Sequence, residues 1–195
     1  KWLFDGIAVL LGAPFVVPIL VLLALVIFLR DGANPFYSQD RVGKGGRLYR
    51  IWKLRTMVVD ADSLLAAHLA ANPAARREWD ETQKLKDDPR ITRIGRILRK
   101  CSLDELPQLW NVLKGDMSLV GPRPMMPEQR ALYPGDAYYR LLPGITGPWQ
   151  VSERNASSFA ARAGFDAAYE RSLSFGADMR LLLATVRVVT RGTGY

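Results

Sequence analysis

An uncharged, apolar run of 24 residues, at positions 6–29, lies between Asp5 and Arg30 near the start of the chain. As an α-helix this run would be about 36 Å long, enough to cross the hydrocarbon core of a bilayer. It is too long for a signal peptide, and no small-residue cleavage site follows it. The run therefore predicts a membrane helix, and the basic residues that dominate after Arg30 place the rest of the chain on the cytoplasmic side.

Two prolines, Pro14 and Pro18, interrupt this run one helical turn apart. Each lacks an N–H group and disturbs the carbonyl four residues earlier, so the pair predicts a bend near the middle of the helix. A bent apolar helix either crosses the membrane or enters it and returns on the same side. The residues alone leave both open, and a kinked span is the more frequent case.

The composition limits the chemistry that the chain can perform. A net charge of +8 and a pI near 9.9 indicate an anionic partner, which is nucleic acid, lipid headgroups or a phosphorylated substrate. Cys101 is the single cysteine, which excludes an internal disulfide and a cysteine zinc cluster. His68 is the single histidine and lies in an alanine-rich stretch typical of a helix surface. Acid–base or nucleophilic chemistry therefore falls mainly to carboxylates.

The segment after the apolar run predicts a small β-hairpin followed by helices. Residues 36–39 and 48–54 have strand character and flank a glycine-rich turn at 43–46. An alanine-rich helix is expected at 61–86, with a break at Asn72-Pro73. Six cations accompany two aspartates, Asp40 and Asp60, in this part of the chain: Arg41, Lys44, Arg47, Arg50, Lys53 and Arg55.

Two further segments have helical periodicity and a cationic face. In residues 90–101 apolar side chains recur at helical spacing, while an arginine occurs at every third position up to Arg99. That face is either solvated or held against phosphates, and the pattern favours neither. Residues 177–191 predict an amphipathic basic helix that lies on anionic lipid or packs on the domain core.

The adjacent carboxylates Asp104 and Glu105 follow the arginine-rich helix. With Ser102 they fit an S-x-x-E capping box, which predicts a helix from this point to Lys114. Pro107 would suit a position nearer the helix start, which leaves Asp104 as the alternative cap. A helix start would favour the ionised form of Asp104, as a carboxylate nucleophile or a metal ligand requires. Because neighbouring carboxylates repel each other, Mg²⁺ is a natural companion. In isolation the pair is more simply a helix cap.

The cations around the carboxylate pair favour a catalytic interpretation over a simple cap. Arg123 lies in a segment stiffened by Pro122 and Pro124, which suits it to holding a phosphate. Mg²⁺ together with arginines around a phosphate is recurrent equipment of phosphoryl transfer.

Several motifs in sequence order resemble the monotopic phosphoglycosyl transferases, the bacterial sugar transferases that start glycan assembly on polyprenol phosphate. The likeness covers nearly the whole chain, and its ending, from 173–175 to 192–195, is most similar to the exopolysaccharide-initiating branch. The motifs are 53–57 (KLRTM), 102–108 (SLDELPQ), 111–118 (NVLKGDMS), 120–124 (VGPRP) and 143–147 (PGITG).

The resemblance implies a specific reaction. A UDP-sugar donates its sugar-1-phosphate to undecaprenyl phosphate, which releases UMP and leaves undecaprenyl-diphosphate-sugar, the first membrane step of exopolysaccharide or other surface glycan synthesis. By position, Asp104 would be the nucleophile that forms a covalent aspartyl-phosphosugar intermediate, and Glu105 would be the ligand of the Mg²⁺ cofactor.

The resemblance also implies roles for residues outside the carboxylate pair. Arg99 and Arg123 match family arginines near that pair and are assigned to phosphate contacts, and Arg55 is assigned to the same role. Asp166 and Tyr169 form a D-x-x-Y segment that is assigned to the neighbourhood of the uridine or the metal.

The membrane segment of the family is a re-entrant helix, commonly broken at a Ser-Pro pair. Pro18 stands at the position of that proline, but Val17 replaces the serine, so the break would depend on Pro14 and Pro18 together. The expected fold is α+β and mostly helical, with a small hairpin and amphipathic interfacial helices around one catalytic domain. Residues 1–30 would form the helix-break-helix anchor, and residues 31–195 the domain on the cytoplasmic face of the bacterial inner membrane.

Three other functions have less support from the sequence. A membrane-tethered nucleic-acid or anionic-lipid binder agrees with the charge, but no recognition-helix or RNP-type motif is present, so nucleic acid is not an expected partner. A scaffold without chemistry leaves the cluster of Arg99, Asp104, Glu105 and Arg123 unexplained. A CDP-alcohol phosphotransferase would need a spaced-aspartate motif, which the sequence lacks. The sugar, a homo-oligomer and any membrane helix before Lys1 are left open.

Overall fold

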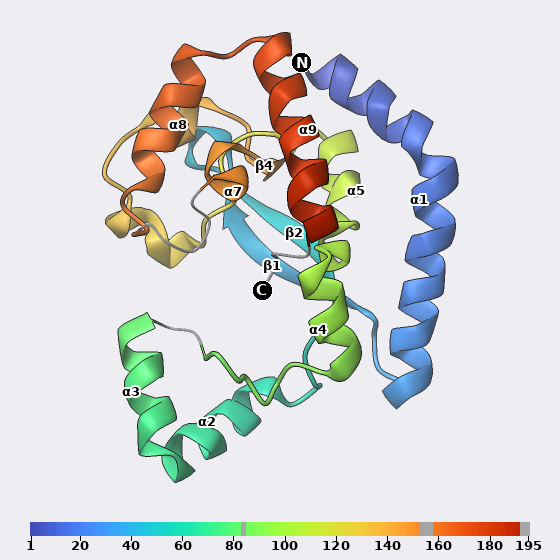
Figure 1. Cartoon of the computed structure of the whole chain (residues 1–195), viewed down its shortest axis with the longest axis vertical. Helices are drawn as coiled ribbons and strands as arrows, with labels where there is room; N and C mark the ends of the chain where they lie inside the picture. Colours follow the sequence, from blue (N-terminus) through green and yellow to red (C-terminus); the bar gives the residue numbers. More distant parts are fainter. Residues whose placement is uncertain (83–84, 153–157, 192–195) are drawn as a thin grey trace.

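The computed structural model describes residues 1–82, 85–152 and 158–191, so the end of the chain at 192–195 lies outside it. The architecture is α+β and mostly helical, as predicted. Figure 1 shows a long helix, α1, bowed along one side of a body of short helices and strands, with the α2–α3 pair set apart at one end.

The apolar run forms a single helix, α1 (Trp2–Asp31), which Gly32 ends in the left-handed conformation. Among the described helices it is the one long and apolar enough to cross a membrane. Pro14 and Pro18 lie inside it, and the helix stays continuous through both while bending about halfway along, so the prolines give a bend and no interruption (Figure 1). Large apolar side chains near the bend face solvent, and Phe15 is 75% exposed.

The predicted hairpin is present, with a longer first strand than expected. Strands β1 (Phe36–Val42) and β2 (Leu48–Leu54) pair antiparallel, and a short 3-10 turn, η1 (Lys44–Gly46), joins them. The fully buried Asn111 fastens this hairpin to helix α5 (Gln108–Leu113). Its side-chain amide accepts a hydrogen bond from the Trp52 N–H at 3.2 Å and donates one to the Arg50 carbonyl at 2.8 Å.

The alanine-rich segment breaks where the sequence predicted, between α2 (Ala61–Ala71) and α3 (Pro73–Thr82). The arginine-rich segment forms α4 (Arg93–Lys100), whose first turn is capped by the Thr92 hydroxyl. Helix α4 approaches the end of the hairpin very closely. A Cβ atom on Gly95 would lie 2.0 Å from the Thr56 carbonyl oxygen.

The predicted capping box at Ser102 does not form. Ser102 itself adopts a left-handed backbone conformation and its side chain caps nothing, while the next residues make a single 3-10 turn, η2 (Leu103–Glu105). Helix α5 (Gln108–Leu113) begins only after Pro107, because a proline is accommodated at a helix start and disrupts a helix interior. The prediction of one continuous helix from the capping box at Ser102 to Lys114 is therefore wrong.

Two short strands pair in parallel, β3 (Ser118–Val120) and β4 (Gly144–Thr146). Strand β3 directly precedes the segment stiffened by Pro122 and Pro124, and β4 lies between Pro143 and Pro148. Helix α9 packs on both strands and lies beside α5 in Figure 1. The remaining described elements are η3 (Pro127–Leu132), α6 (Ala137–Arg140), α7 (Pro148–Val151), α8 (Arg162–Arg171) and α9 (Phe175–Arg191).

Candidate active site

The carboxylate pair lies in the short turn η2, against the hairpin. Asp104 is buried, with 7% of its surface exposed. Lys53 of β2 reaches across from the hairpin and places its Nζ 2.8 Å from Glu105 Oε1 and 3.8 Å from Asp104 Oδ2. One ammonium group therefore neutralises part of the charge of both carboxylates, which is necessary because buried charges are costly unless they are paired.

The protonation of Asp104 is governed mainly by burial and nearby charges, and a backbone hydrogen bond makes the smallest contribution, which lowers the pKa. Burial raises the pKa of Asp104 above its ordinary value, Lys53 lowers it, Glu105 raises it and Arg99 lowers it. The expectation that a helix start would keep Asp104 ionised is therefore wrong. The cations around it supply that stabilisation in part, and a raised pKa makes Asp104 a more basic carboxylate than a free one.

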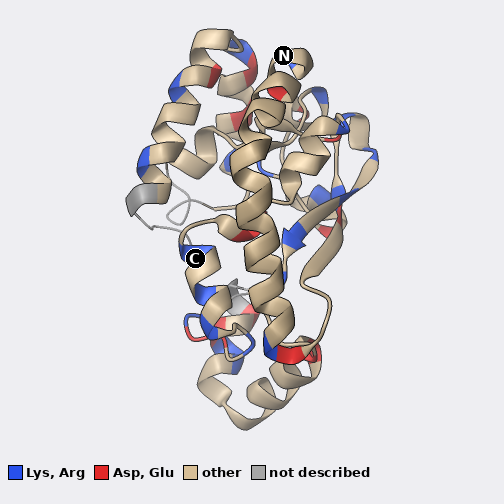
Figure 2. Ribbon diagram, turned by 90° about the vertical axis from the view of Figure 1, so that its right-hand side faces the viewer, with Lys and Arg blue, Asp and Glu red and all other residues tan. Residues whose placement is uncertain are grey.

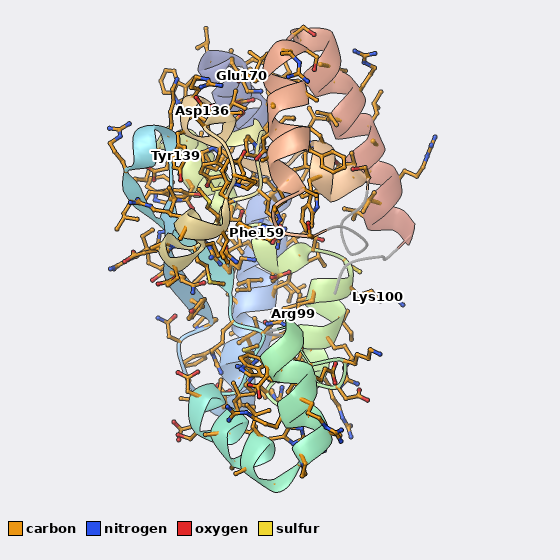
Figure 3. All side chains as sticks on the ribbon, turned by 90° about the vertical axis from the view of Figure 1, so that its left-hand side faces the viewer. Arg99, Lys100, Asp136, Tyr139, Phe159 and Glu170 are labelled. Atoms are coloured by element: carbon orange, nitrogen blue, oxygen red, sulfur yellow. The ribbon has the colours of Figure 1, made fainter. Side chains whose placement is uncertain are left out.

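Two of the predicted phosphate-binding arginines lie beside the carboxylate pair. Arg99, on α4 and labelled in Figure 3, donates from Nε to the Thr56 hydroxyl at 2.9 Å, and its charge acts on Asp104. Burial lowers the pKa of Arg99, and the neighbouring Asp104 raises it. Arg123 follows β3 and places Nη2 3.9 Å from Glu105 Oε1. The structure thus brings Arg99 and Arg123 to opposite members of the pair.

Arg41 and Arg162 extend the cationic cluster beyond Arg123, and the sequence motifs assign neither to the site. Burial, followed by repulsion from Arg123, lowers the pKa of both, that of Arg162 to about 10. The Arg162 guanidinium lies 4.1 Å from the centroid of the Trp149 ring and 4.6 Å from that of Phe159, labelled in Figure 3. Partly buried arginines that repel each other favour an anionic ligand.

Arg55 lies outside this cluster. Its guanidinium makes two hydrogen bonds to the Asp31 carboxylate, at 2.6 and 2.8 Å, and a third to the Asn34 carbonyl at 2.8 Å. These contacts fasten the end of α1 to the hairpin. Arg55 therefore pairs with Asp31 in a structural contact, and the structure does not bring it to the carboxylate pair.

The D-x-x-Y residues are buried in α8. Asp166 accepts a hydrogen bond from the Tyr133 hydroxyl at 2.8 Å, and burial raises the pKa of Asp166 to about 6. The Tyr169 hydroxyl accepts from Lys1 Nζ at 2.9 Å and bonds to the Asp178 carboxylate. Tyr169 thus joins α8, α9 and the start of α1, whereas the charge of Arg162 links Asp166 to the arginine cluster.

The carboxylate pair fits a Mg²⁺ ion of the kind that binds with its substrate. Mg²⁺ commonly takes one or two protein carboxylates together with phosphate oxygens and water. The described residues contain no group of three or more acidic, histidine or cysteine side chains able to hold a metal, so substrate oxygens would have to complete the coordination. The Lys53 ammonium already marks a cation position between Asp104 and Glu105.

The chain is similar to several known proteins over most of its length. The family model described as bacterial sugar transferase matches residues 1–192. The chain is 46% identical, over its whole length, to the UDP-galactose-lipid carrier transferase of Erwinia amylovora. It is 41% identical over 98% of its length to the exopolysaccharide production protein ExoY of Sinorhizobium fredii. It is 48% identical over 85% of its length to the undecaprenyl-phosphate galactose phosphotransferase of Salmonella typhimurium.

The relatives differ in how much of their own length they share with this chain. It covers 85% of ExoY, but 41% and 35% of the Erwinia and Salmonella proteins. The match to the family model nevertheless covers residues 1–192, which include the hairpin, the carboxylate pair and the arginine-bearing loops. The chain belongs to the bacterial sugar transferase family.

Proposed function

We propose that the chain transfers a sugar-1-phosphate from a UDP-sugar to undecaprenyl phosphate, at the start of exopolysaccharide or other surface glycan synthesis. The observation that carries this proposal is the buried carboxylate Asp104 with Glu105 beside it, flanked by three cations that can hold phosphates. Lys53 contacts both carboxylates, the charge of Arg99 acts on Asp104, and Arg123 lies 3.9 Å from Glu105. The family and the names of the relatives, which include a lipid carrier transferase and an undecaprenyl-phosphate galactose phosphotransferase, support the two substrates.

The chemistry follows from a carboxylate held among cations. An oxygen of the Asp104 carboxylate attacks the β-phosphorus of the UDP-sugar, and the bond from that phosphorus to the bridging oxygen breaks, which releases UMP. A phosphate oxygen of the acceptor then attacks the same phosphorus, and the bond to Asp104 breaks. Arg99 and Arg123 stabilise the charge that spreads over the transferred phosphoryl group in both steps.

Glu105, with Asp104 beside it, would hold the Mg²⁺ cofactor. Bound there, the ion would neutralise charge on the diphosphate of the donor. Lys53 would then hold the Glu105 carboxylate in place, because its ammonium group already lies 2.8 Å from Oε1.

The assay that tests this function measures UMP release from a panel of UDP-sugars, with detergent-solubilised protein, undecaprenyl phosphate and Mg²⁺. UDP-galactose and UDP-glucose come first, since relatives are named for galactose and glucose. We expect sustained UMP release with at least one sugar, only when the acceptor is present. No release with any sugar, together with salt-sensitive binding of nucleic acid, would support the binding-protein alternative.

The structure also supports a re-entrant path for α1. Near its start, Asp5 accepts a hydrogen bond from the Ser118 hydroxyl at 2.6 Å, and Phe4 packs edge-to-face on Phe175. At its end, Asp31 holds Arg55. Both ends are therefore fastened to one domain, while the charge-free middle of the helix faces outward (Figure 2). Such a helix would dip into one leaflet of the inner membrane and leave the catalytic domain on the cytoplasmic face.

Cysteine labelling tests this path in a Cys101→Ser background. We expect Leu3→Cys and Arg30→Cys both to react with a membrane-impermeant maleimide in inside-out vesicles, and neither in right-side-out vesicles. Phe15→Cys, at the bend, is the matched control and should be protected in both. Labelling of Leu3→Cys and Arg30→Cys from opposite faces would identify a plain transmembrane span.

A further inference from the structure

Two cavities of opposite character meet at Glu105 and Arg123. The larger, about 210 Å³, lies between η2, α5, α7 and α9, and is lined mainly by aliphatic side chains such as Leu106, Leu109 and Val188. The smaller is a recess of about 20 Å³ on the hairpin side. Both include Glu105, Arg123 and Ile145 in their walls, so a ligand in either one would reach the same catalytic carboxylate pair.

The smaller recess is polar and basic. Arg41 and Lys53 line it together with Gln108, which is 2% exposed and whose amide nitrogen has no hydrogen-bond partner among the described residues. These are donors suited to phosphate oxygens. The recess therefore suits phosphate oxygens of a water-soluble donor.

The larger cavity has few groups that would suit a sugar. Its two threonines are already engaged, because the Thr185 hydroxyl donates to the Leu181 carbonyl at 2.7 Å and lies 2.7 Å from the Thr146 hydroxyl. Gln150, 7% exposed, is different, since neither its amide nitrogen nor its oxygen has a partner within the described part of the chain. An unpartnered buried amide is costly, so it indicates a ligand with at least one polar group.

The side of α9 that faces away from the cavity also carries exposed apolar side chains. Leu183 is 66% exposed and Val186 is 60% exposed, on the same helix that contributes Val188 to the cavity. A helix with exposed aliphatic side chains and basic residues is suited to the surface of a membrane. The cavity thus lies behind a helix that a lipid-borne ligand would meet first.

We infer that this aliphatic cavity receives the first isoprenoid unit of the acceptor lipid and sets its phosphate beside Arg123 and Gln150. The inference rests on the proposed function and adds where the acceptor binds. Apolar chain atoms replace water against the aliphatic wall, while the phosphate accepts hydrogen bonds from the Arg123 guanidinium and the Gln150 amide. The two cavities then separate the two substrates by polarity and meet at Glu105 and Arg123, beside Asp104.

The test is Val188→Phe, which fills the cavity, with Val186→Phe as the matched control on the outer side of α9. We expect Val188→Phe to raise the KM for undecaprenyl phosphate about tenfold or more, and to leave the KM for the UDP-sugar unchanged. Val186→Phe should change neither. If Val188→Phe is inactive with all substrates, Val188→Leu, which adds one methylene, takes its place.

Gln150→Leu tests the polar end of the same cavity. We expect the KM for the acceptor to rise about tenfold, because a hydrogen bond to a charged phosphate is lost, with no change in the KM for the UDP-sugar. A raised KM for the UDP-sugar in Val188→Phe or Gln150→Leu would show that the donor occupies the cavity and overturn the inference. If the proposed function is wrong, the unsubstituted protein itself makes no lipid-linked product.

Discussion

Asp104→Asn is expected to abolish turnover, with a loss of roughly 10⁴-fold or more, because the amide cannot attack the phosphorus. The substitution changes little in size, so the turn that carries it should keep its shape. When the protein is incubated with a UDP-sugar and no acceptor, intact-protein mass spectrometry should detect a phosphosugar adduct. The Asn variant should show none. Because burial raises the pKa of Asp104, turnover should also fall on the acid side at a higher pH than a free aspartate would give.

Asp136→Asn is the control for this experiment. Asp136 is an exposed carboxylate that pairs with Arg140, on a different part of the fold. Its variant should keep both turnover and adduct. Normal turnover in Asp104→Asn would show that Asp104 is not the nucleophile. If this variant lost the adduct but kept its turnover, the covalent intermediate would be ruled out, although the transfer reaction itself would still stand.

Gly95→Ala is expected to have the largest effect on stability. A Cβ atom there would lie 2.0 Å from the oxygen and 2.7 Å from the carbon of the Thr56 carbonyl, so backbone has to move. We expect a loss of about 3 kcal/mol or more in the free energy of unfolding. For a chain of this size that lowers the thermal midpoint by roughly 6 to 12 °C. Turnover should fall as well, since Arg99 bonds to the hydroxyl of the same threonine.

Gly164→Ala provides the matched comparison. Gly164 lies in α8, and a Cβ atom added there would meet nothing within 4 Å, so alanine should be neutral or stabilise the helix by up to about 1 kcal/mol. Thermal unfolding in detergent, followed by circular dichroism, measures both variants. Similar midpoints for the two would mean that α4 has room to move away from Thr56 at little cost.

Local patterns predicted much of the fold, because they report on residues close in sequence. The hairpin followed from strand-forming residues around a glycine turn, and the break between α2 and α3 followed from Asn72-Pro73. The parallel pair β3 and β4 was not predicted. Each strand has three residues, too few to show a period, and the partners of Ser118 and Val120 lie at Gly144 and Thr146.

The site was predicted in part, and the omissions share one cause. Asp104, Glu105 and Arg123 belong to short, dense motifs, and Arg99 belongs to the segment with an arginine at every third position. Lys53 begins the 53–57 motif, but its contact with Glu105 spans 52 positions of sequence, which no local pattern reveals. Arg162 carries no motif of its own, and its place in the cluster follows from its stacking on Trp149 and its repulsion from Arg123.

The contacts at the two ends of α1 affect the height of the proposed active site above the bilayer. A domain on a flexible tether samples a range of heights, whereas a helix bonded through Asp5 at one end and Asp31 at the other leaves little such freedom. In the proposed re-entrant arrangement the membrane segment would therefore set the height of the domain as well as anchor it. It would hold Asp104 at a constant depth, within reach of phosphates at the level of the lipid headgroups and out of reach of phosphates farther from the membrane.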